Sequence, residues 1–322
     1  MIATSKDPLV SIILNNYNYG CYLKQSIDSA LNQTYGRIEV IVVDDGSEDK
    51  SLEVINSYAD NSIIPILKDN AGQASAFNAG FLASSGEIVC LLDSDDFFYP
   101  SKISRIVEAF ANHPSIGWIF HKLTYVDKQS ALISMDEPKN SFIQSARIDW
   151  RSRMKKGARA LVLPATGGLC IRREILGKIL PMPESRGVTI SDNYIKYASL
   201  AISPGFLFAD RLAAQRIHGK NIYTFQENWK LRSEINIKTG YYLRKSYPEI
   251  QLFADKLFSQ GCGEMLAEMG IKRLIEMPEF KKYLQGFMSA SMVAINFPKI
   301  IIHAIRFKLR RCLLNTKFLI SE

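Results

Sequence analysis

Three aspartates follow a short apolar run in the first third of the chain. The run Ile88–Leu92 has the length and β-branched content of a strand buried on both faces, and Asp93, Asp95 and Asp96 come directly after it. Buried carboxylates are costly unless they are paired or hold a cation, so the acids are expected at the mouth of the strand. Because carboxylates bind hard divalent cations that bridge to phosphates, we expect Asp93 and Asp95 to hold one Mg²⁺ or Mn²⁺ ion. The alternative is that these acids only cap the next helix.

Two earlier apolar runs also end in polar residues. Residues 9–14 are followed by Asn15, and residues 38–43 by Asp44 and Asp45. The periodicity predicts strands at residues 9–14, 38–43, 63–67 and 88–92, with helices at residues 22–33, 51–58 and 73–84. This alternation predicts an α/β fold, a mostly parallel sheet flanked by helices. Because ligands bind outside the carboxyl ends of such strands, the three polar ends should line one crevice.

Two common phosphate-binding motifs are absent from the sequence, and their absence excludes two classes of nucleotide-binding protein. The first predicted strand is not followed by G-x-G-x-x-G, and the chain has no G-x-x-x-x-G-K-[ST]. The sequence therefore lacks the dinucleotide fingerprint and the P-loop. A cation on Asp93 and Asp95 is then the available way to bind a phosphorylated ligand.

Composition and charge exclude further classes. The five cysteines are scattered without a C-x-x-C pair, which argues against a disulfide scaffold or a zinc site and indicates a reducing compartment. We expect no signal peptide and no membrane-spanning helix, and hence a cytoplasmic protein. The net charge is +8, and residues 280–321 contain eight basic residues and no acid. The body of the chain is therefore near neutral, and we expect no nucleic-acid partner.

Four motifs together carry a family resemblance. Val10–Asn18, Val42–Ser47, Asn78–Gly80 and Leu92–Asp96 resemble, in order and spacing, the family 2 glycosyltransferases of the GT-A fold. The resemblance covers residues 8–222. It implies a Rossmann-like sheet and a metal-dependent, inverting transfer of a sugar from a nucleotide-diphosphate donor, a UDP-sugar. The acceptor would be a hydroxyl of a saccharide or a lipid-linked molecule, as in cell-surface polysaccharide synthesis.

The resemblance also implies roles for residues on the donor side. Asn15, Tyr17, Asp45 and Ser94 would contact the donor nucleotide, with Tyr17 packed against the base and Asp45 accepting a hydrogen bond from it. An aromatic face and an acceptor at the base edge suit a flat, polar-edged ring. Ser94 is the middle residue of the D-x-D motif, whose two aspartates would serve the metal and the sugar diphosphate.

Two positions depart from the family pattern. Many relatives have Pro-Thr where this chain has Asn15 and Asn16, and many have Arg where this chain has Phe77. The second change removes one phosphate partner from that helix.

Asp192 is the candidate general base on the acceptor side. The family's base often belongs to a Glu-Asp pair, and here the pair is Ser191-Asp192. Asp192 would remove the proton from the acceptor hydroxyl, and displacement from the opposite face implies inversion. The alternative is a first-turn acid that complements the dipole of the helix it begins.

Five further residues are weaker site candidates. They are Gln73, at the start of a predicted helix; Thr166 and Gly167, in a small-residue stretch near which relatives hold the acceptor; and Arg216 and His218, in a segment resembling the R-x-H-x-x-N end of the catalytic domain. A tight bend explains the small-residue stretch equally well, and a structural role explains His218 at least as well.

The resemblance divides the chain into a catalytic domain, residues 1–222, and a helical region, residues 223–322. Residues 299–314 form a basic amphipathic pattern that suits peripheral contact with the cytoplasmic face of a membrane. A helix docked on the protein with a solvated basic edge is the equal alternative. A helical appendage of this kind also suits a homo-oligomer.

Two other functions compete with the glycosyltransferase. One is a catalytically silent module of the same fold that only binds a sugar nucleotide or glycan. The other is a nucleotidyltransferase, which would need a Gly-rich, Arg-containing loop after the first strand that this chain lacks.

Overall fold

The computed structural model describes residues 7–58, 62–133, 144–158, 161–184, 192–219, 221, 228–287 and 298–309. The chain forms two compact units. One unit contains Met1–Ser152 and Ala160–Asn221, and the other contains Arg153–Arg159 and Ile222–Glu322. The second unit thus includes a short segment from within the range that the sequence assigns to the catalytic domain.

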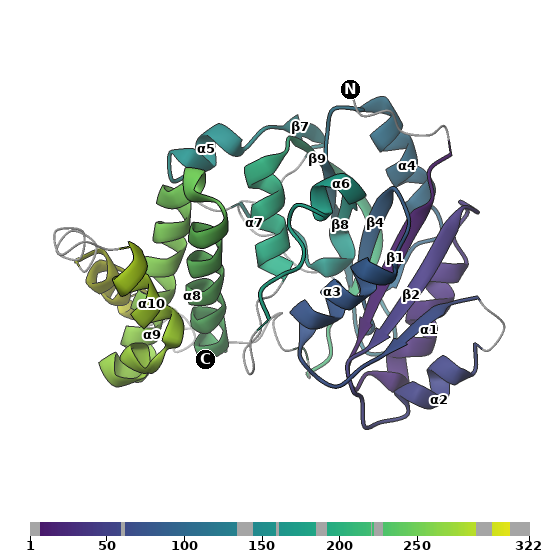
Figure 1. Ribbon diagram of the computed structural model, residues 1–322. Coiled ribbons are helices and arrows are strands. Elements are labelled where there is room, and N and C mark those ends of the chain that lie inside the picture. The colour runs from purple at the N-terminus through teal and green to yellow at the C-terminus, as the bar shows by residue number, and fades with distance from the viewer. Residues whose placement is uncertain are drawn as a thin grey trace, which may run out of the picture. The chain divides into compact units, whose positions relative to one another are not determined.

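The first unit is built on a mixed sheet with a parallel N-terminal half (Figure 1). Its strands are β1 Val10–Asn16, β2 Ile38–Asp44, β3 Ile64–Leu67, β4 Ile88–Asp93, β5 Phe97–Phe98, β6 Trp118–Val126, β7 Ala146–Ile148, β8 Leu169–Arg172 and β9 Gly205–Arg216. They lie in the order β3-β2-β1-β4-β8-β6-β9-β5, and β7 pairs with β9. The predicted α/β sheet is confirmed, and β3, which contains Pro65, is an edge strand as a proline in a strand predicts.

The parallel register aligns the ends of the central strands. Asn15 of β1 pairs with Val43 of β2 on one side and with Asp93 of β4 on the other. The polar residues that follow these three apolar runs therefore lie along one edge of the sheet. This is the edge at which open α/β sheets bind ligands.

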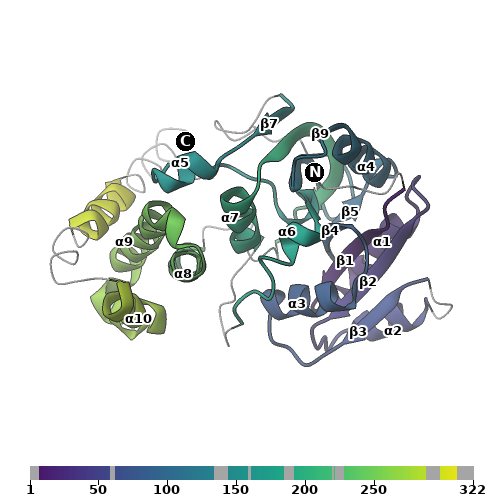
Figure 2. The same cartoon turned by 45° about the horizontal axis from the view of Figure 1, so that its top comes forward.

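Helices cover both faces of the parallel strands (Figures 1 and 2). On one face, helix α3 (Gln73–Ala83) packs so closely that a Cβ added at Gly80 would lie 2.4 Å from a methyl group of Ile13. Ile12 points the other way, into a core shared with Leu23 and Ile27 of helix α1 (Gly20–Leu31). Successive residues of β1 thus serve opposite faces, which explains why the strand is apolar throughout.

The remaining helices of this unit connect or flank the strands. They are α2 Ser51–Asn56, α4 Lys102–Asn112, α6 Arg173–Leu176, α7 Asp192–Ile202 and the single 3-10 turn η1 Thr166–Gly168; α5 Arg151–Lys155 crosses the division between the units. Helix α4 begins well after the three aspartates, and its N-cap residue is Ser101. The alternative that Asp93, Asp95 or Asp96 caps the next helix is therefore wrong.

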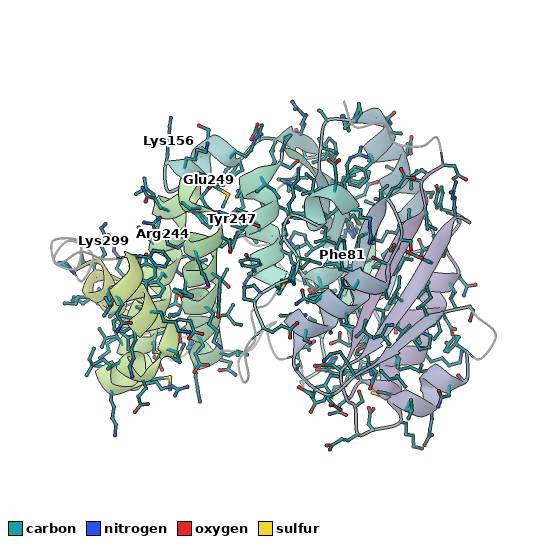
Figure 3. All side chains as sticks on the ribbon, in the orientation of Figure 1. Phe81, Lys156, Arg244, Tyr247, Glu249 and Lys299 are labelled. Atoms are coloured by element: carbon teal, nitrogen blue, oxygen red, sulfur yellow. The ribbon has the colours of Figure 1, made fainter. Side chains whose placement is uncertain are left out.

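The second unit is a bundle of helices. These are α8 Trp229–Ser246, α9 Gln251–Glu276, α10 Pro278–Phe287 and a helical segment at residues 298–309, with a 3-10 turn η2 Pro248–Ile250 between α8 and α9. Phe258 and Tyr283 stack with ring centroids 3.7 Å apart in its core. Arg244, labelled in Figure 3, forms an ion pair with Asp255 of α9, with its Nε 3.1 Å from Asp255 Oδ1. In the part of the chain that the structure describes, no helix is long and apolar enough to cross a membrane.

Glycine allows α8 and α9 to approach backbone to backbone. A Cβ at Gly240 of α8 would lie 2.7 Å from the backbone nitrogen of Phe258, whereas one at Gly286 of α10 would meet nothing within 4 Å. Only the first glycine is therefore required by packing.

These two glycines give a matched stability test. Gly240→Ala should lower the free energy of unfolding by about 1–3 kcal/mol, because the backbone of α9 must move away. Gly286→Ala should leave it unchanged or raise it by up to about 1 kcal/mol, because alanine favours a helix and has room here. Urea unfolding of the full chain, followed by circular dichroism, measures both. Equal effects of the two substitutions would contradict the close approach of α8 and α9.

Candidate active site

Asn16 and Asp44 join the ends of β1 and β2. The Asn16 side-chain amide donates to Asp44 Oδ1 at 2.7 Å, and the Ser47 backbone N–H donates to Asp44 Oδ2 at 2.9 Å. Both side chains are buried. Asp44 therefore shapes the turn after β2, as expected for a carboxylate that accepts from nearby backbone and side-chain donors.

Asp45 holds the loop that leads into α3. Its Oδ2 accepts from the backbone N–H of Gly72 at 2.7 Å, and its Oδ1 accepts from Ala71 N–H at 3.1 Å and from Lys68 Nζ at 2.5 Å. These contacts use three of roughly four acceptor positions on a carboxylate. Asp45 is thus a structural residue in this conformation, and its expected contact with the nucleotide base stays a prediction.

Tyr17 is the exposed aromatic at the mouth of the sheet. Its side chain is 44% exposed, although it directly follows the buried strand β1. The next residue, Asn18, has a left-handed φ of 59° and accepts from the Glu48 backbone N–H at 2.8 Å. The turn is therefore tied to the loop after β2, and it leaves the face of Tyr17 accessible to a flat ligand.

Asn15 and Gln73 carry buried polar atoms that lack a partner. Among the described residues, both amide atoms of Asn15 and the Gln73 Oε1 have no hydrogen-bond partner. The Gln73 Nε2 donates to Asp93 Oδ1 at 3.3 Å. Leaving a buried polar atom unpaired costs about 1–3 kcal/mol, so such atoms mark the place where a polar ligand is expected.

Asp93 is the centre of the acidic cluster. Burial, followed by the Asp95 carboxylate, raises its pKa to about 7, and the Asp192 carboxylate acts in the same direction. Hydrogen bonds from Thr166 and Gln73 act in the opposite direction. Asp93, at the end of β4, thus interacts with Thr166 of η1 and Gln73 of α3 by hydrogen bonds, and with Asp192 of α7 by charge.

Asp95 is positioned by the end of β9. Its Oδ2 lies 2.9 Å from His218 Nε2, and its backbone oxygen accepts from Arg216 Nε at 2.9 Å. The His218 ring stacks on Tyr22 with a centroid distance of 5.1 Å. The C-terminal end of β9 thus holds one member of the acidic pair in place, although it lies more than a hundred residues away in the sequence.

Arg216 is engaged by the protein itself. Its guanidinium donates to the carbonyls of Asp127 and Lys128 and to the side chains of Ser130 and Gln25, and it is 1% exposed. These contacts fit a structural role for Arg216 better than its role as a site candidate. Its backbone N–H donates to Asp96 Oδ1 at 2.8 Å, so Asp96 joins β4 to β9.

Asp192 is the first residue of α7 and is close enough to Asp93 to influence its pKa. Its Oδ2 lies 3.0 Å from Lys196 Nζ, one turn further along α7, and Lys196 also donates to the carbonyl of Pro164. Ser191, the preceding residue and the other member of the Ser191-Asp192 pair, lies outside the described residues. Asp192 lies in the first turn of α7 and also near the acidic cluster. It can therefore complement the helix dipole and still be the candidate general base, so the two interpretations do not exclude each other.

The small-residue stretch forms η1 beside β4. Thr166 is buried and bonds to Asp93, while the Gly167 carbonyl accepts from the buried Lys102 Nζ at 2.7 Å. A Cβ at Gly168 would lie 2.7 Å from the carbonyl oxygen of His121, so the second glycine is required by packing. The stretch is therefore a tight bend that also brings Thr166 to the acidic cluster.

Two residues near the cluster were not predicted. Burial and the nearby Asp95 and Asp93 carboxylates raise the pKa of the Tyr19 hydroxyl, so this tyrosine borders the site; the only signal in the sequence is its place in the run after β1. Lys196 was missed as well, although its spacing of four residues from Asp192 is typical of an ion pair on a helix.

Asp93 and Asp95 are the carboxylates that would hold a divalent cation. No group of three or more His, Cys, Asp or Glu residues placed to hold a metal is found among the described residues. Magnesium, however, is usually bound by one or two carboxylates, with waters and substrate phosphates completing its shell. Asp93 and Asp95 supply such a pair. Gln73 donates its Nε2 to Asp93, and the Oε1 of the same side chain has no partner among the described residues.

Comparison with known families and sequences agrees with this geometry. Residues 11–180 match the model of "Glycosyl transferase family 2". An uncharacterized glycosyltransferase of Nostoc sp. is 34% identical over 241 residues, which is 74% of each chain. The chondroitin synthase of Pasteurella multocida is 37% identical over 129 residues, but these are 39% of this chain and only 13% of that protein.

Solved structures share the fold. Residues 1–349 of S. aureus TarS in complex with UDP-GlcNAc superpose with a TM-score of 0.63 at 15% identity, covering 92% of this chain and 89% of that one. The mannosyltransferase PcManGT of Pyrobaculum calidifontis, in complex with GDP-Man and Mn²⁺, gives a TM-score of 0.51 at 16% identity, covering 93% and 87%. At these identities the likeness shows the GT-A fold alone. The family match, which spans more than half of the chain, shows the class: the chain belongs to glycosyl transferase family 2 and is a glycosyltransferase.

Proposed function

We propose that this enzyme transfers a sugar, with inversion, from a UDP-sugar to a hydroxyl of a saccharide or lipid-linked acceptor in polysaccharide synthesis, and that it uses Mg²⁺ or Mn²⁺. The observation that carries the proposal is the arrangement at the carboxyl edge of the sheet, where Gln73 Nε2 lies 3.3 Å from Asp93 Oδ1 and His218 Nε2 lies 2.9 Å from Asp95 Oδ2. Asp192 is near enough to this pair to act on Asp93. The names of relatives support the product class, since they include a chondroitin synthase and a hyaluronan synthase. The structural neighbours bound to UDP-GlcNAc and GDP-Man support a nucleotide-sugar donor.

The donor nucleotide would lie across the ends of β1 and β2. Tyr17 offers an exposed aromatic face to the base, and Asn15 offers an unpaired amide with both a donor and an acceptor. Asp45 keeps one acceptor position for the base edge. Ser94, whose backbone N–H donates to the Asn15 carbonyl, connects this part of the site to the acidic pair.

The diphosphate would lie over Asp93 and Asp95. A bound cation would neutralise the negative charge that grows on the leaving diphosphate. It would also remove the electrostatic penalty of two carboxylates placed close together with little solvent. His218 keeps Asp95 oriented, and Gln73 and Thr166 do the same for Asp93.

Asp192 would act as the base. The acceptor oxygen attacks the anomeric carbon, its proton passes to the Asp192 carboxylate, and the carbon–oxygen bond to the diphosphate breaks with its electron pair on the leaving group. Attack from the face opposite the leaving group inverts the anomeric carbon. Lys196 fixes the orientation of Asp192 through the contact between Nζ and Oδ2.

The first test separates chemistry from donor binding. Asp192→Asn should lower kcat by about 10²–10⁴-fold, because the proton acceptor is lost, while UDP binding in the presence of Mn²⁺ changes less than threefold. The assay measures UDP release from the UDP-sugar that gives the largest metal-dependent thermal shift, and calorimetry measures UDP binding. Asp210→Asn is the matched control, because Asp210 pairs with Arg105 at the surface. Full turnover in Asp192→Asn would reject this residue as the base.

The second test addresses the cation. Asp95→Asn keeps an acceptor for His218 but removes one negative charge, so UDP should bind at least tenfold more weakly and no longer respond to Mn²⁺. In the unaltered enzyme, EDTA should weaken UDP binding to a similar extent. Calorimetry with UDP, with and without Mn²⁺, measures both. Were Asp95→Asn to keep its response to Mn²⁺, the ion would have to bind elsewhere.

A silent binding module is the competing outcome. It would bind UDP with Mn²⁺ and yet release none from any UDP-sugar in the presence of saccharide or lipid-linked acceptors.

A further inference from the structure

The helical segment 298–309 of the C-terminal unit uses one side for packing within that unit. Ile300, Ala304 and Phe307 are buried, and the Phe307 ring meets Trp229 of α8 edge-on with a centroid distance of 4.9 Å. The backbone of this segment lies against α9, because a Cβ added at Gly263 would be 2.8 Å from the Ile300 carbonyl oxygen. The docked-helix alternative from the sequence therefore describes one side of this helix.

The other side of the same helix exposes apolar side chains. Ile301, Ile302, Ile305 and Leu309 are 42%, 45%, 53% and 59% exposed. At about 100° per residue, these four side chains span an arc of about 100° that points away from the buried side. Scattered exposed apolar residues are ordinary, but four on one contiguous arc indicate an interaction surface. We call these four residues the apolar arc.

Basic residues border the apolar arc on both sides. On the same helical projection, Lys299 and Arg306 follow one edge and Lys308 lies just beyond the other, and all three are exposed. Lys299 is labelled in Figure 3 at the start of this segment, which is the yellow helix of Figure 2. The sequence from residue 280 to residue 321 contains no acid, and Glu264 of α9, which acts electrostatically on His303 of this segment, is buried.

We propose that the apolar arc binds the surface of a membrane that contains anionic lipids, with the helix axis parallel to the membrane. A helix with an apolar strip between basic edges places its apolar side chains at the boundary of headgroups and acyl chains, and its cations among anionic headgroups. The inference does not depend on the donor or the reaction proposed above. It is compatible with a lipid-linked acceptor, which such attachment would bring near the enzyme.

A second copy of the chain fits this surface less well. In a two-fold symmetric pair, each apolar arc would face its copy, and the basic edges would lie against one another. Four side chains also provide much less than the roughly 1,200 Å² that stable protein interfaces bury. An anionic lipid surface offers acyl chains to the apolar arc and negative headgroups to the basic residues that border it.

Vesicle sedimentation of the full chain tests the proposal. The protein should sediment with vesicles made of equal parts phosphatidylcholine and phosphatidylglycerol, and at least tenfold less with phosphatidylcholine alone. Salt at about 1 M should reduce the binding, because the Debye length falls to roughly 3 Å. Equal binding to both vesicle types, or to neither, would overturn the proposal.

Matched double variants locate the surface. Ile301→Ser with Ile305→Ser should lower binding to the anionic vesicles at least tenfold. The control is Ile271→Ser with Ile275→Ser on α9, which has the same spacing and similar exposure, 46% and 49%; it should bind as the unaltered chain does. A charge variant, Lys299→Gln with Arg306→Gln and Lys308→Gln, should also lose at least tenfold. Loss of binding in the Ile271 and Ile275 control alone would place the surface elsewhere.

Two further readouts separate membrane binding from misfolding and from dimer formation. All variants should keep the melting temperature and the Mn²⁺-dependent UDP binding of the unaltered chain, since the substituted side chains are exposed and outside the candidate active site. Sedimentation velocity should give the same mass for the unaltered chain and for the Ile301 and Ile305 variant. A dimer that this variant converts to a monomer, without any vesicle binding, would assign the apolar arc to a second copy and overturn the proposal.

Discussion

The candidate active site depends on the cost of keeping carboxylates close together at the edge of the sheet. Burial, followed by the nearby carboxylates of Asp95 and Asp192, raises the pKa of Asp93 to about 7. The protein offsets the cost in part through the hydrogen bonds that Gln73 and Thr166 donate to Asp93. Such an arrangement is costly for folding alone, and the proposed cation would offset most of the repulsion between the carboxylates.

Acidic residues of similar appearance have different tasks in this fold. Asp44 shapes the turn after β2, Asp45 holds the loop before α3, and Asp96 joins β4 to β9. These contacts engage Asp44, Asp45 and Asp96 within the protein, and Asp93 and Asp95 are the pair proposed to hold a cation. Arg216 belongs with the structural group, because its guanidinium is surrounded by protein acceptors. The motifs of the family therefore combine scaffold residues with residues available for chemistry, and charge type alone does not distinguish them.

In the C-terminal unit, the structure bears directly on one of the two interpretations of the helix at residues 298–309, the docked one. Residues 298–309 are apolar around most of the helix, which blurs a simple amphipathic pattern. Ile300, Ala304 and Phe307, three of its seven apolar side chains, are buried. The four exposed ones form the apolar arc, with basic residues on both sides, which is the pattern expected at a lipid surface. Docking to the bundle and the proposed contact with a membrane would therefore use different sides of the same helix.

The sequence by itself determined the alternation of strands and helices, the polar strand ends and the family, because these depend on local periodicity and on residues close together in the chain. It also predicted that Asn15, Asp45 and Asp93 would lie along one edge, since parallel strands align their carboxyl ends. Only the tertiary structure decided that His218 orients Asp95, that Arg216 is enclosed by protein, that Asp45 holds the loop before α3, and that residues 153–159 join the C-terminal unit. Each of these depends on contacts between segments distant in sequence, and such contacts are set by packing of the whole fold rather than by any local pattern.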